Sequence, residues 1–231
     1  MFFPFWDPSF LIVLPALALA IYAQFKVRST YQRMSRVQSA CGRTGREVAE
    51  LILQSNGISG VTVNRAGGVL SDNFDPRSRT VNLSEDIHDG KSLASLAIAA
   101  HEVGHVIQHH RGYAPVGMRD AILPAANIGT FLAFPLFFIG LIFHSGMSTV
   151  LMDLGIALFG MTVLFHVVTL PTEFDASNRA MHELTSRGLL SPDEAGMARK
   201  VLNAAALTYI AAAAMALLQL LRLVMIRNSR D

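Results

Sequence analysis

The sequence predicts a mainly helical integral membrane protein, in which a small region with a short sheet lies between the membrane helices. Of the 231 residues, 52% are hydrophobic and only 16% are charged, and the mean hydropathy is +0.39. These values are too apolar for an ordinary soluble domain. Four apolar stretches approach or exceed the length of roughly 20 residues that a helix needs to cross a bilayer. They lie at residues 8–25, 121–143, 149–170 and 204–226.

Charge and cysteine content narrow the classes of partner. The net charge is only +2, and the sequence contains no long block of Lys and Arg, so nothing indicates nucleic-acid binding. Cys41 is the single cysteine, which excludes an internal disulfide framework and a cysteine-rich zinc site. We therefore expect the lipid bilayer, and not nucleic acid, as a partner.

The first apolar stretch is expected to be an uncleaved membrane anchor. It begins without the basic residue that a cleaved signal peptide requires. Lys26, Arg28, Arg33 and Arg36 follow it directly. Because an excess of Lys and Arg marks the cytoplasmic side of a span, we expect the N-terminus outside and the following region in the cytoplasm.

An amphipathic helix is predicted over residues 37–58. Thr44 and Glu47 have the spacing of a capping box, in which each side chain bonds the backbone N–H of the other residue. Asn56 and Gly57 provide a helix stop.

Two short extended segments follow this helix, Val61–Val63 and Thr80–Leu83. Glycines and the turn residues Ser71–Pro76 separate them, so we predict a small hairpin or sheet. An exposed strand edge at Val81–Leu83 would allow an extended peptide to pair with it through main-chain hydrogen bonds. The alternative is that both strands are purely structural.

The next helix carries a pattern with chemical meaning. Residues 92–108 are rich in helix formers, and Gly112 follows as a stop. Within the helix, His101 and His105 are four residues apart and therefore stack on one face, close enough to share a metal ion. With Glu102 they form the H-E-x-x-H arrangement, in which two imidazoles bind Zn²⁺ and the glutamate takes a proton from the metal-bound water. Such a site needs a third protein ligand.

The apolar stretches 121–143 and 149–170 are predicted to form a membrane hairpin, joined by the polar link at residues 144–148. A hairpin starts and ends on one side, so the segment after residue 170 returns to the side of the histidine helix. There a polar helical segment is expected to end at Gly188, and a capping box at Ser191 and Glu194 opens the last helix. That helix continues into residues 204–226. Arg222, Arg227 and Arg230 near its end fit the positive-inside rule poorly if the C-terminus lies outside.

Two histidine-based alternatives for the third ligand are excluded. The metzincin pattern requires Gly and His where this chain has Gln108 and Arg111. His109 lies one helical turn beyond His105, roughly 6 Å farther along the axis, so it should miss the metal. We interpret His109 and His110 as a solvated helix end.

The remaining candidates are two carboxylates of the returning segment, Glu173 and Asp175. Glutamate is the usual third ligand of a His₂Glu set, so we choose Glu173. We assign Asp175 a supporting role, orienting an imidazole N–H. In the structural alternative, either carboxylate pairs with Arg179 or caps its own helix.

Together these segments resemble the YugP-like neutral zinc membrane metallopeptidases of bacteria. The resemblance covers nearly the whole chain and is carried by His101–His105, Ser71–Pro76, Val81–Ser84, Leu170–Ser177 and Ala204–Tyr209. It implies an integral membrane zinc peptidase with a zincin-like catalytic region. Its ligands would be His101, His105 and Glu173, and its catalytic residue Glu102.

The sequence is also similar to the wider group of HtpX-type membrane proteases. That group has a cytoplasmic active site between spans and a returning segment E-F-x-A-D. Here Glu173, Phe174 and Ala176 are kept, but Ser177 stands where the group carries Asp. The departure leaves two arrangements open around the ligands: Asp175 has taken the orienting role, or the site is built differently.

We therefore expect a zinc metalloendopeptidase of the gluzincin type with one Zn²⁺ per chain. It would form a single membrane-embedded domain over residues 1–231, with a catalytic region at residues 37–120 and 171–203 on the cytoplasmic side of the cell membrane. Its substrates would be membrane or membrane-proximal proteins. One alternative is a membrane-bound scaffold or adaptor with structural zinc, and another is a metallohydrolase for non-peptide bonds. Tyr113, His182 and Arg179 are all conceivable partners for the oxyanion.

Overall fold

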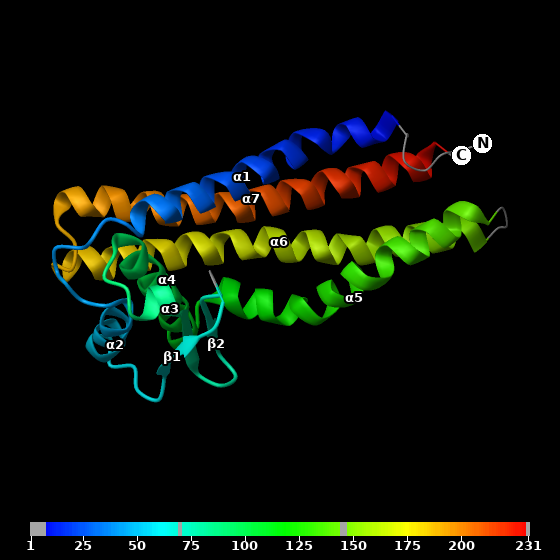
Figure 1. The fold of residues 1–231 in the computed structure, drawn as a ribbon. Helices are drawn as coiled ribbons and strands as arrows, with labels where there is room; N and C mark the ends of the chain where they lie inside the picture. The colour runs from blue at the N-terminus through cyan, green and yellow to red at the C-terminus, as the bar shows by residue number, and fades with distance from the viewer. Residues whose placement is uncertain (1–7, 69–70, 144–146, 230–231) are drawn as a thin grey trace. The chain divides into compact units, whose positions relative to one another are not determined.

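The computed structural model describes residues 8–68, 71–143 and 147–229. Helices dominate these residues, and the only sheet among them has three strands (Figure 1). The predicted fold class, mainly helical with a small sheet, is confirmed at this level. The chain divides into two compact units. The long-helix unit comprises Met1–Ala23, Gly117–Leu170 and Thr208–Asp231, and the sheet unit comprises Gln24–Val116 and Pro171–Leu207.

Three helices of the described residues are long and apolar enough to cross a membrane. They are α5 (Ala114–Ile142), α6 (Met147–Ser186) and α7 (Pro192–Asn228). They carry the apolar stretches expected at 121–143, 149–170 and 204–226. Both α6 and α7 run on without a break into the polar segments that join them, so the expected return segment continues the helix of the preceding span.

The expected span at residues 8–25 is not among the three candidate spans of the described residues. This stretch divides into a short 3-10 helix, η1 (Pro8–Ile12), and α1 (Leu14–Met34). Lys26 and Arg28 follow only twelve residues into α1. The continuous helix therefore has only a short apolar part before its first charges, and the membrane anchor stays a prediction.

Small residues let α5 and α6 pack closely within the long-helix unit. A Cβ atom added to Gly129 would lie 2.2 Å from the carbonyl oxygen of Leu158, and one added to Gly155 would lie 2.7 Å from that of Ala133. Phe137 and Met152 fill the core beside these crossings and are fully buried. This is the usual way in which helices associate in a membrane, where hydrophobic burial gives little driving force. The link between α5 and α6 at residues 144–146 lies outside the described residues.

The basic residues near the end of α7 have partners within the same unit. Arg227 Nε lies 2.9 Å from Asp153 Oδ1 of α6. The guanidinium of Arg222 donates to Ser9 Oγ at 3.2 Å and lies over the ring of Phe10. Because these charges are neutralised or covered locally, they conflict less with an outside C-terminus than counting basic residues suggests. Arg230 lies outside the described residues.

In the sheet unit, α2 (Gly45–Ser55) is shorter than the helix expected at 37–58. The capping box is confirmed, because Glu47 N–H donates to Thr44 Oγ1 and Thr44 N–H donates to Glu47 Oε2. The preceding residues are not helical. The backbone of Gln38 instead forms a β-bridge with Ser92, a contact distant in sequence.

The sheet contains β1 (Thr62–Ala66), β2 (Asn73–Asp75) and β3 (Thr80–Ser84) in the order β1-β3-β2. β1 is parallel to β3, and β2 is antiparallel to it. The two expected strands are present, but β2 lies in a segment that was expected to be only a turn. The expectation of an exposed edge at Val81–Leu83 is wrong, since β3 is the central strand. The free edges belong to β1 and β2.

Helix α4 (Leu93–His110) forms the centre of the sheet unit (Figure 1). Its apolar face is buried together with side chains of α2, of β3, of the one-turn helix α3 (Glu85–His88) and of the polar ends of α6 and α7. The predicted capping box of α7 is confirmed by bonds between Ser191 and Glu194 in both directions. Glu194 also accepts a hydrogen bond from the N–H of Ala40 at 2.7 Å. The start of α7 is thereby tied to the segment before α2.

Candidate metal centre

Helix α4 presents both histidines on one side. Ser92 caps its N-terminus by accepting the N–H of Ser95, and the helix ends at Arg111 before Gly112, whose φ of 63° is the left-handed conformation that favours glycine. Along this helix the ring centroids of His101 and His105 lie 4.7 Å apart. Both side chains are mostly buried, with 13% and 15% of their surfaces exposed.

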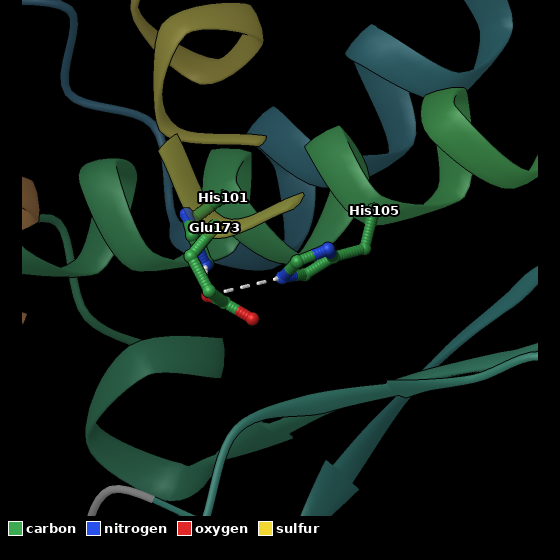
Figure 2. Close-up of side chains that lie close together, drawn as sticks. All are labelled: His101, His105 and Glu173. Atoms are coloured by element: carbon green, nitrogen blue, oxygen red, sulfur yellow. Dashed lines mark ion pairs between the residues drawn. The ribbon is translucent and has the colours of Figure 1, made fainter. Parts of the chain in front are cut away.

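Helix α6 adds Glu173 to the pair of histidines (Figure 2). Its Oε2 lies 3.3 Å from His101 Nε2 and 3.6 Å from His105 Nε2. One ligand atom from each of the three residues lies within 4.8 Å of the other two. The structure therefore brings together the three side chains that the sequence proposes as ligands, although 68 residues separate Glu173 from His105.

Gly104 makes this convergence sterically feasible. A Cβ atom at this position would lie 2.5 Å from the carbonyl oxygen of Ala176 and 3.2 Å from its Cα atom. Real side chains do not approach a backbone so closely. The glycine between the two histidines thus lets α4 and α6 touch backbone to backbone, one turn from Glu173.

The three side chains fit a metal ion. Glu173 Oε2 is fully buried and accepts no hydrogen bond with acceptable geometry among the described residues, and a buried acceptor without a partner is costly. Tetrahedral zinc, with bonds of about 2.1 Å, holds its donor atoms about 3.4 Å apart. The 3.3 and 3.6 Å separations match that spacing. Two imidazoles and one carboxylate are also the donor set of a His₂Glu zinc site.

Each imidazole has a polar partner on the nitrogen that faces away from Glu173. His105 Nδ1 lies 3.0 Å from Gln108 Oε1, and His101 Nδ1 lies 3.2 Å from Ser177 Oγ. Such contacts orient metal-binding imidazoles and leave the Nε2 atoms directed at the ion. The role of Gln108 was not predicted from the sequence, although its position three residues after His105 places it on the same face of the helix. Ser177, read there only as a departure from related proteases, contacts His101 directly.

Asp175, which was expected to orient an imidazole, reaches one only indirectly. Its Oδ2 accepts from Gln108 Nε2 at 2.8 Å, and Gln108 in turn contacts His105. Asp175 also forms an ion pair with Arg179, the pairing that the structural alternative proposed. The Arg179 guanidinium lies 5.6 Å from the ring centroid of Tyr113. Two of the three oxyanion candidates, Arg179 and Tyr113, thus lie next to each other, whereas the side chain of His182 is 75% exposed.

The ionisable groups of the site influence one another strongly. Burial alone would raise the pKa of Glu173, but the two facing imidazoles outweigh burial and hold that pKa well below its usual range. Burial disfavours a charged His105, yet the carboxylates of Glu173 and Glu102 outweigh burial and raise the pKa of the imidazole. Burial raises the pKa of Glu102, and the two imidazoles offset this only in part. The site as a whole favours a positive charge between the three ligand atoms.

The neighbouring histidines behave as the sequence predicted. His109 and His110 are exposed at the end of α4, and the ring of His109 contacts Phe74 of β2 with centroids 6.0 Å apart. Neither belongs to the group of potential metal ligands found among the described residues. The catalytic candidate Glu102 is buried, with 8% of its surface exposed.

Comparisons with known proteins agree with this geometry. Residues 9–228 match the protein family described as "Putative neutral zinc metallopeptidase". The chain is also 43% identical over 221 residues to the protein named "Putative membrane protease YugP" of Bacillus subtilis (strain 168), covering 95% of this chain and 97% of that protein. No solved structure matches the chain. The resemblance drawn from the sequence motifs is confirmed, and the chain belongs to this family of neutral zinc metallopeptidases.

Proposed function

We propose that the protein is a zinc-dependent membrane endopeptidase that hydrolyses peptide bonds of membrane or membrane-proximal proteins. The observation that carries the proposal is the convergence of His101, His105 and Glu173, in which one buried carboxylate oxygen has no hydrogen-bond donor within the described part of the chain. The protein would hold one Zn²⁺ at these three residues. We further infer that residues 1–231 work as one membrane-embedded peptidase domain.

Glu102 is the proposed general base. Zinc bound by the three ligands would lower the pKa of a coordinated water toward 7 and polarise the scissile carbonyl. Glu102 is the residue after His101 on α4, and its side chain is buried. This burial raises the pKa of its carboxyl group. A carboxylate with a raised pKa is a stronger base and would accept the proton of the attacking water more readily, and the resulting acid would then give that proton to the leaving amine. The buried surroundings of Glu102 also limit access of bulk water to this proton transfer.

The outer edge of β2 supports the proposal that the substrate is a polypeptide. β2 packs against α4, and Phe74 of β2 contacts His109, one helical turn beyond His105. Its other edge pairs with β3, so the outer edge has no strand partner among the described residues. An extended peptide could add to this edge through main-chain hydrogen bonds, which a non-peptide substrate would not use.

We place the site on the cytoplasmic side, at the membrane surface. Lys26, Arg28 and Arg33 follow the proposed anchor at residues 8–25 and lie in the same unit as the ligands. Basic residues directly after a span mark its cytoplasmic side. Glu173 follows the apolar stretch that ends near residue 170 on the same helix. The three helical steps from residue 170 to Glu173 amount to a rise of about 4.5 Å.

Zinc content and proteolysis of the purified protein would test the proposal. The full chain and Glu102→Gln are compared in detergent, with an unfolded model protein as substrate. We expect about one zinc per chain in both proteins. Loss of the general base should lower the cleavage rate of the variant about 10²- to 10⁴-fold.

Two other results would contradict the proposal. If both proteins bind zinc and neither cleaves a protein, the metal is structural and the chain is a membrane scaffold or adaptor. If Glu102→Gln cleaves as fast as the original protein, Glu102 is not the base, and the mechanism is wrong even if the activity is real.

A further inference from the structure

Gln108 is fully buried in α4, three residues after His105, and both ends of its amide make hydrogen bonds. Its Oε1 lies 3.0 Å from His105 Nδ1. Its Nε2 lies 2.7 Å from the carbonyl oxygen of Thr172 and 2.8 Å from Asp175 Oδ2. Gln108 therefore joins the helix that carries two ligands to the segment of α6 that carries the third.

The direction of these hydrogen bonds is fixed by chemistry. A carbonyl oxygen and an ionised carboxylate can only accept, so the amide nitrogen of Gln108, with two hydrogens, must face Thr172 and Asp175. The amide oxygen then faces His105 and can only accept as well. His105 must therefore carry a hydrogen on Nδ1, so in the neutral imidazole the lone pair is on Nε2, which faces Glu173.

The hydrogen bond of His101 lacks this constraint. Its Nδ1 lies 3.2 Å from Ser177 Oγ, and a hydroxyl can either donate or accept by rotating. The Ser177 contact is thus compatible with either tautomer of His101. Among the two imidazoles, only that of His105 is held by a partner of fixed polarity.

Arg179 reinforces the arrangement from the other side. Its Nε donates to Asp175 Oδ2, the same oxygen that accepts from Gln108. In this ion pair Asp175 is an acceptor for both Arg179 and Gln108. A chain of donors and acceptors consequently runs from Arg179 through Asp175 and Gln108 to His105.

We propose that Gln108 is a positioning residue that holds His105 in its Nδ1–H tautomer and keeps Glu173 aligned with α4 through Thr172 and Asp175. This inference rests on the proposed zinc site. It assigns two separable tasks to one side chain: the amide oxygen selects the tautomer, and the amide nitrogen holds the α6 segment.

Two substitutions in the full-length protein separate these tasks. Gln108→Met has a similar volume and no hydrogen-bonding group, so it should lose both tasks. Gln108→Glu keeps an acceptor for His105 but turns a carboxylate toward two other acceptors. Competition with a chromogenic chelator should show zinc affinity reduced about 10- to 100-fold in each variant, the usual cost of losing a partner of a metal ligand. Gln54→Met, at an exposed position of α2, is the matched control and should bind zinc unchanged.

The tautomer is measured without metal and without activity. Nitrogen-15 spectra of histidine-labelled, zinc-free protein are recorded at a pH high enough that the imidazole of His105 is neutral. They report which ring nitrogen carries hydrogen, and the His105 signal is identified by its loss in His105→Ala. We expect hydrogen on Nδ1 in the original protein and in Gln108→Glu. In Gln108→Met, the Nε2–H tautomer should become populated. A merely structural role would lower stability without moving the tautomer.

A second-site substitution provides a rescue. Asp175→Asn replaces an acceptor with an amide that can donate to the carboxylate introduced by Gln108→Glu. The double variant should therefore bind zinc more tightly than Gln108→Glu alone.

The outcomes distinguish this inference from the proposed function. Unchanged zinc affinity or an unchanged tautomer in folded Gln108→Met would overturn the inference and leave the peptidase proposal intact. Failure of the original protein to bind zinc would instead remove the proposed function, on which this inference depends.

Discussion

At the scale of single residues, the two carboxylates of the returning segment have different surroundings. Glu173 points its buried Oε2 at both imidazoles, whereas Asp175 pairs with Arg179 and accepts from Gln108. Residues two positions apart on a helix are rotated by about 200° around its axis, so the side chains of Glu173 and Asp175 cannot bind the same ion. The structure therefore favours Glu173 as ligand and Asp175 as support.

This difference predicts unequal losses on substitution. Glu173→Ala removes a donor and should weaken zinc binding more than about 100-fold, beyond the range for loss of a supporting group. Asp175→Asn should weaken it less, by about tenfold, because Gln108 retains the Thr172 carbonyl as a partner. Chelator competition measures both affinities. Equal losses of zinc affinity, or a larger loss for Asp175→Asn, would contradict the assignment of Glu173 as the third ligand.

Whether a residue of the site could be predicted depends on how far apart its contacts lie along the sequence. His101, Glu102 and His105 are linked by helical periodicity alone, so the sequence was sufficient to group them. Glu173 came from excluding other ligands and from the family resemblance, because no local pattern reports a helix crossing. The role of Gln108 could not be predicted, because its partners Thr172 and Asp175 are known only once α4 and α6 are placed together.

At the scale of elements, the crossing of α4 and α6 depends on the absence of one methyl group. Gly104→Ala would place a carbon 2.5 Å from the Ala176 carbonyl oxygen and force the helices apart. We expect it to destabilise the protein by about 1–3 kcal/mol and to weaken zinc binding. Thermal unfolding in detergent and chelator competition would measure the two effects.

Gly196 in α7 provides the control for that substitution. Nothing lies within 4 Å of a Cβ atom at this position. Gly196→Ala should therefore leave zinc affinity unchanged and stabilise the helix by up to about 1 kcal/mol. If Gly104→Ala behaves in the same way, close packing at the crossing is not what aligns the ligands.

The cap of α7 predicts a dependence of stability on pH. Burial opposes ionisation of Glu194, but bonds from the N–H groups of Ser191 and Ala40 outweigh burial and lower its pKa. A carboxylate with a lowered pKa in the folded state stabilises the protein above its unfolded pKa of about 4.3 and loses this contribution as pH falls through the folded value. Glu194→Gln should therefore melt at a lower temperature than the original protein at pH 7.

The difference between the two melting temperatures should shrink as pH falls below about 4.3. Thermal scans at several pH values would test this. A difference that stays constant down to acid pH would mean that the ionised carboxylate contributes nothing to the cap.

Elements were predictable from sequence to the extent that their signals are local. Both capping boxes, at Thr44 and Ser191, were predicted and are present. The order of the strands was not, because pairing of β1 with β3 is decided by contacts between segments distant in sequence. The same reason explains the wrong start of α2, where Gln38 pairs with Ser92 instead of joining the helix.

At the scale of the whole molecule, the hairpin of α5 and α6 implies which parts of the chain share a side of the membrane. If the long apolar parts of both helices cross the bilayer, the segments before α5 and after residue 170 lie on one side and the start of α6 on the other. The chain has only one cysteine, Cys41, which makes labelling straightforward.

Impermeant maleimide should therefore label two introduced cysteines from opposite sides. In a Cys41→Ser background, Arg77→Cys in the exposed turn before β3 should react only after cells are permeabilised. Met147→Cys, at a position with 66% of its surface exposed, should react in intact cells. Labelling of Arg77→Cys in intact cells would place the site outside and contradict the cytoplasmic assignment.

The buried core around α4 has a consequence for how the protein acquires its metal. Small zinc domains fold only with the ion, because they have too little apolar surface to do otherwise. Here Val48, Ile52, Leu83, Leu96 and Leu184 are fully buried around the helix that bears the histidines, so this unit has an apolar core independent of the ion. Membrane insertion and folding can then precede zinc delivery. If the site holds zinc, a chelator should yield a folded, metal-free protein that rebinds the ion without passing through an unfolded chain.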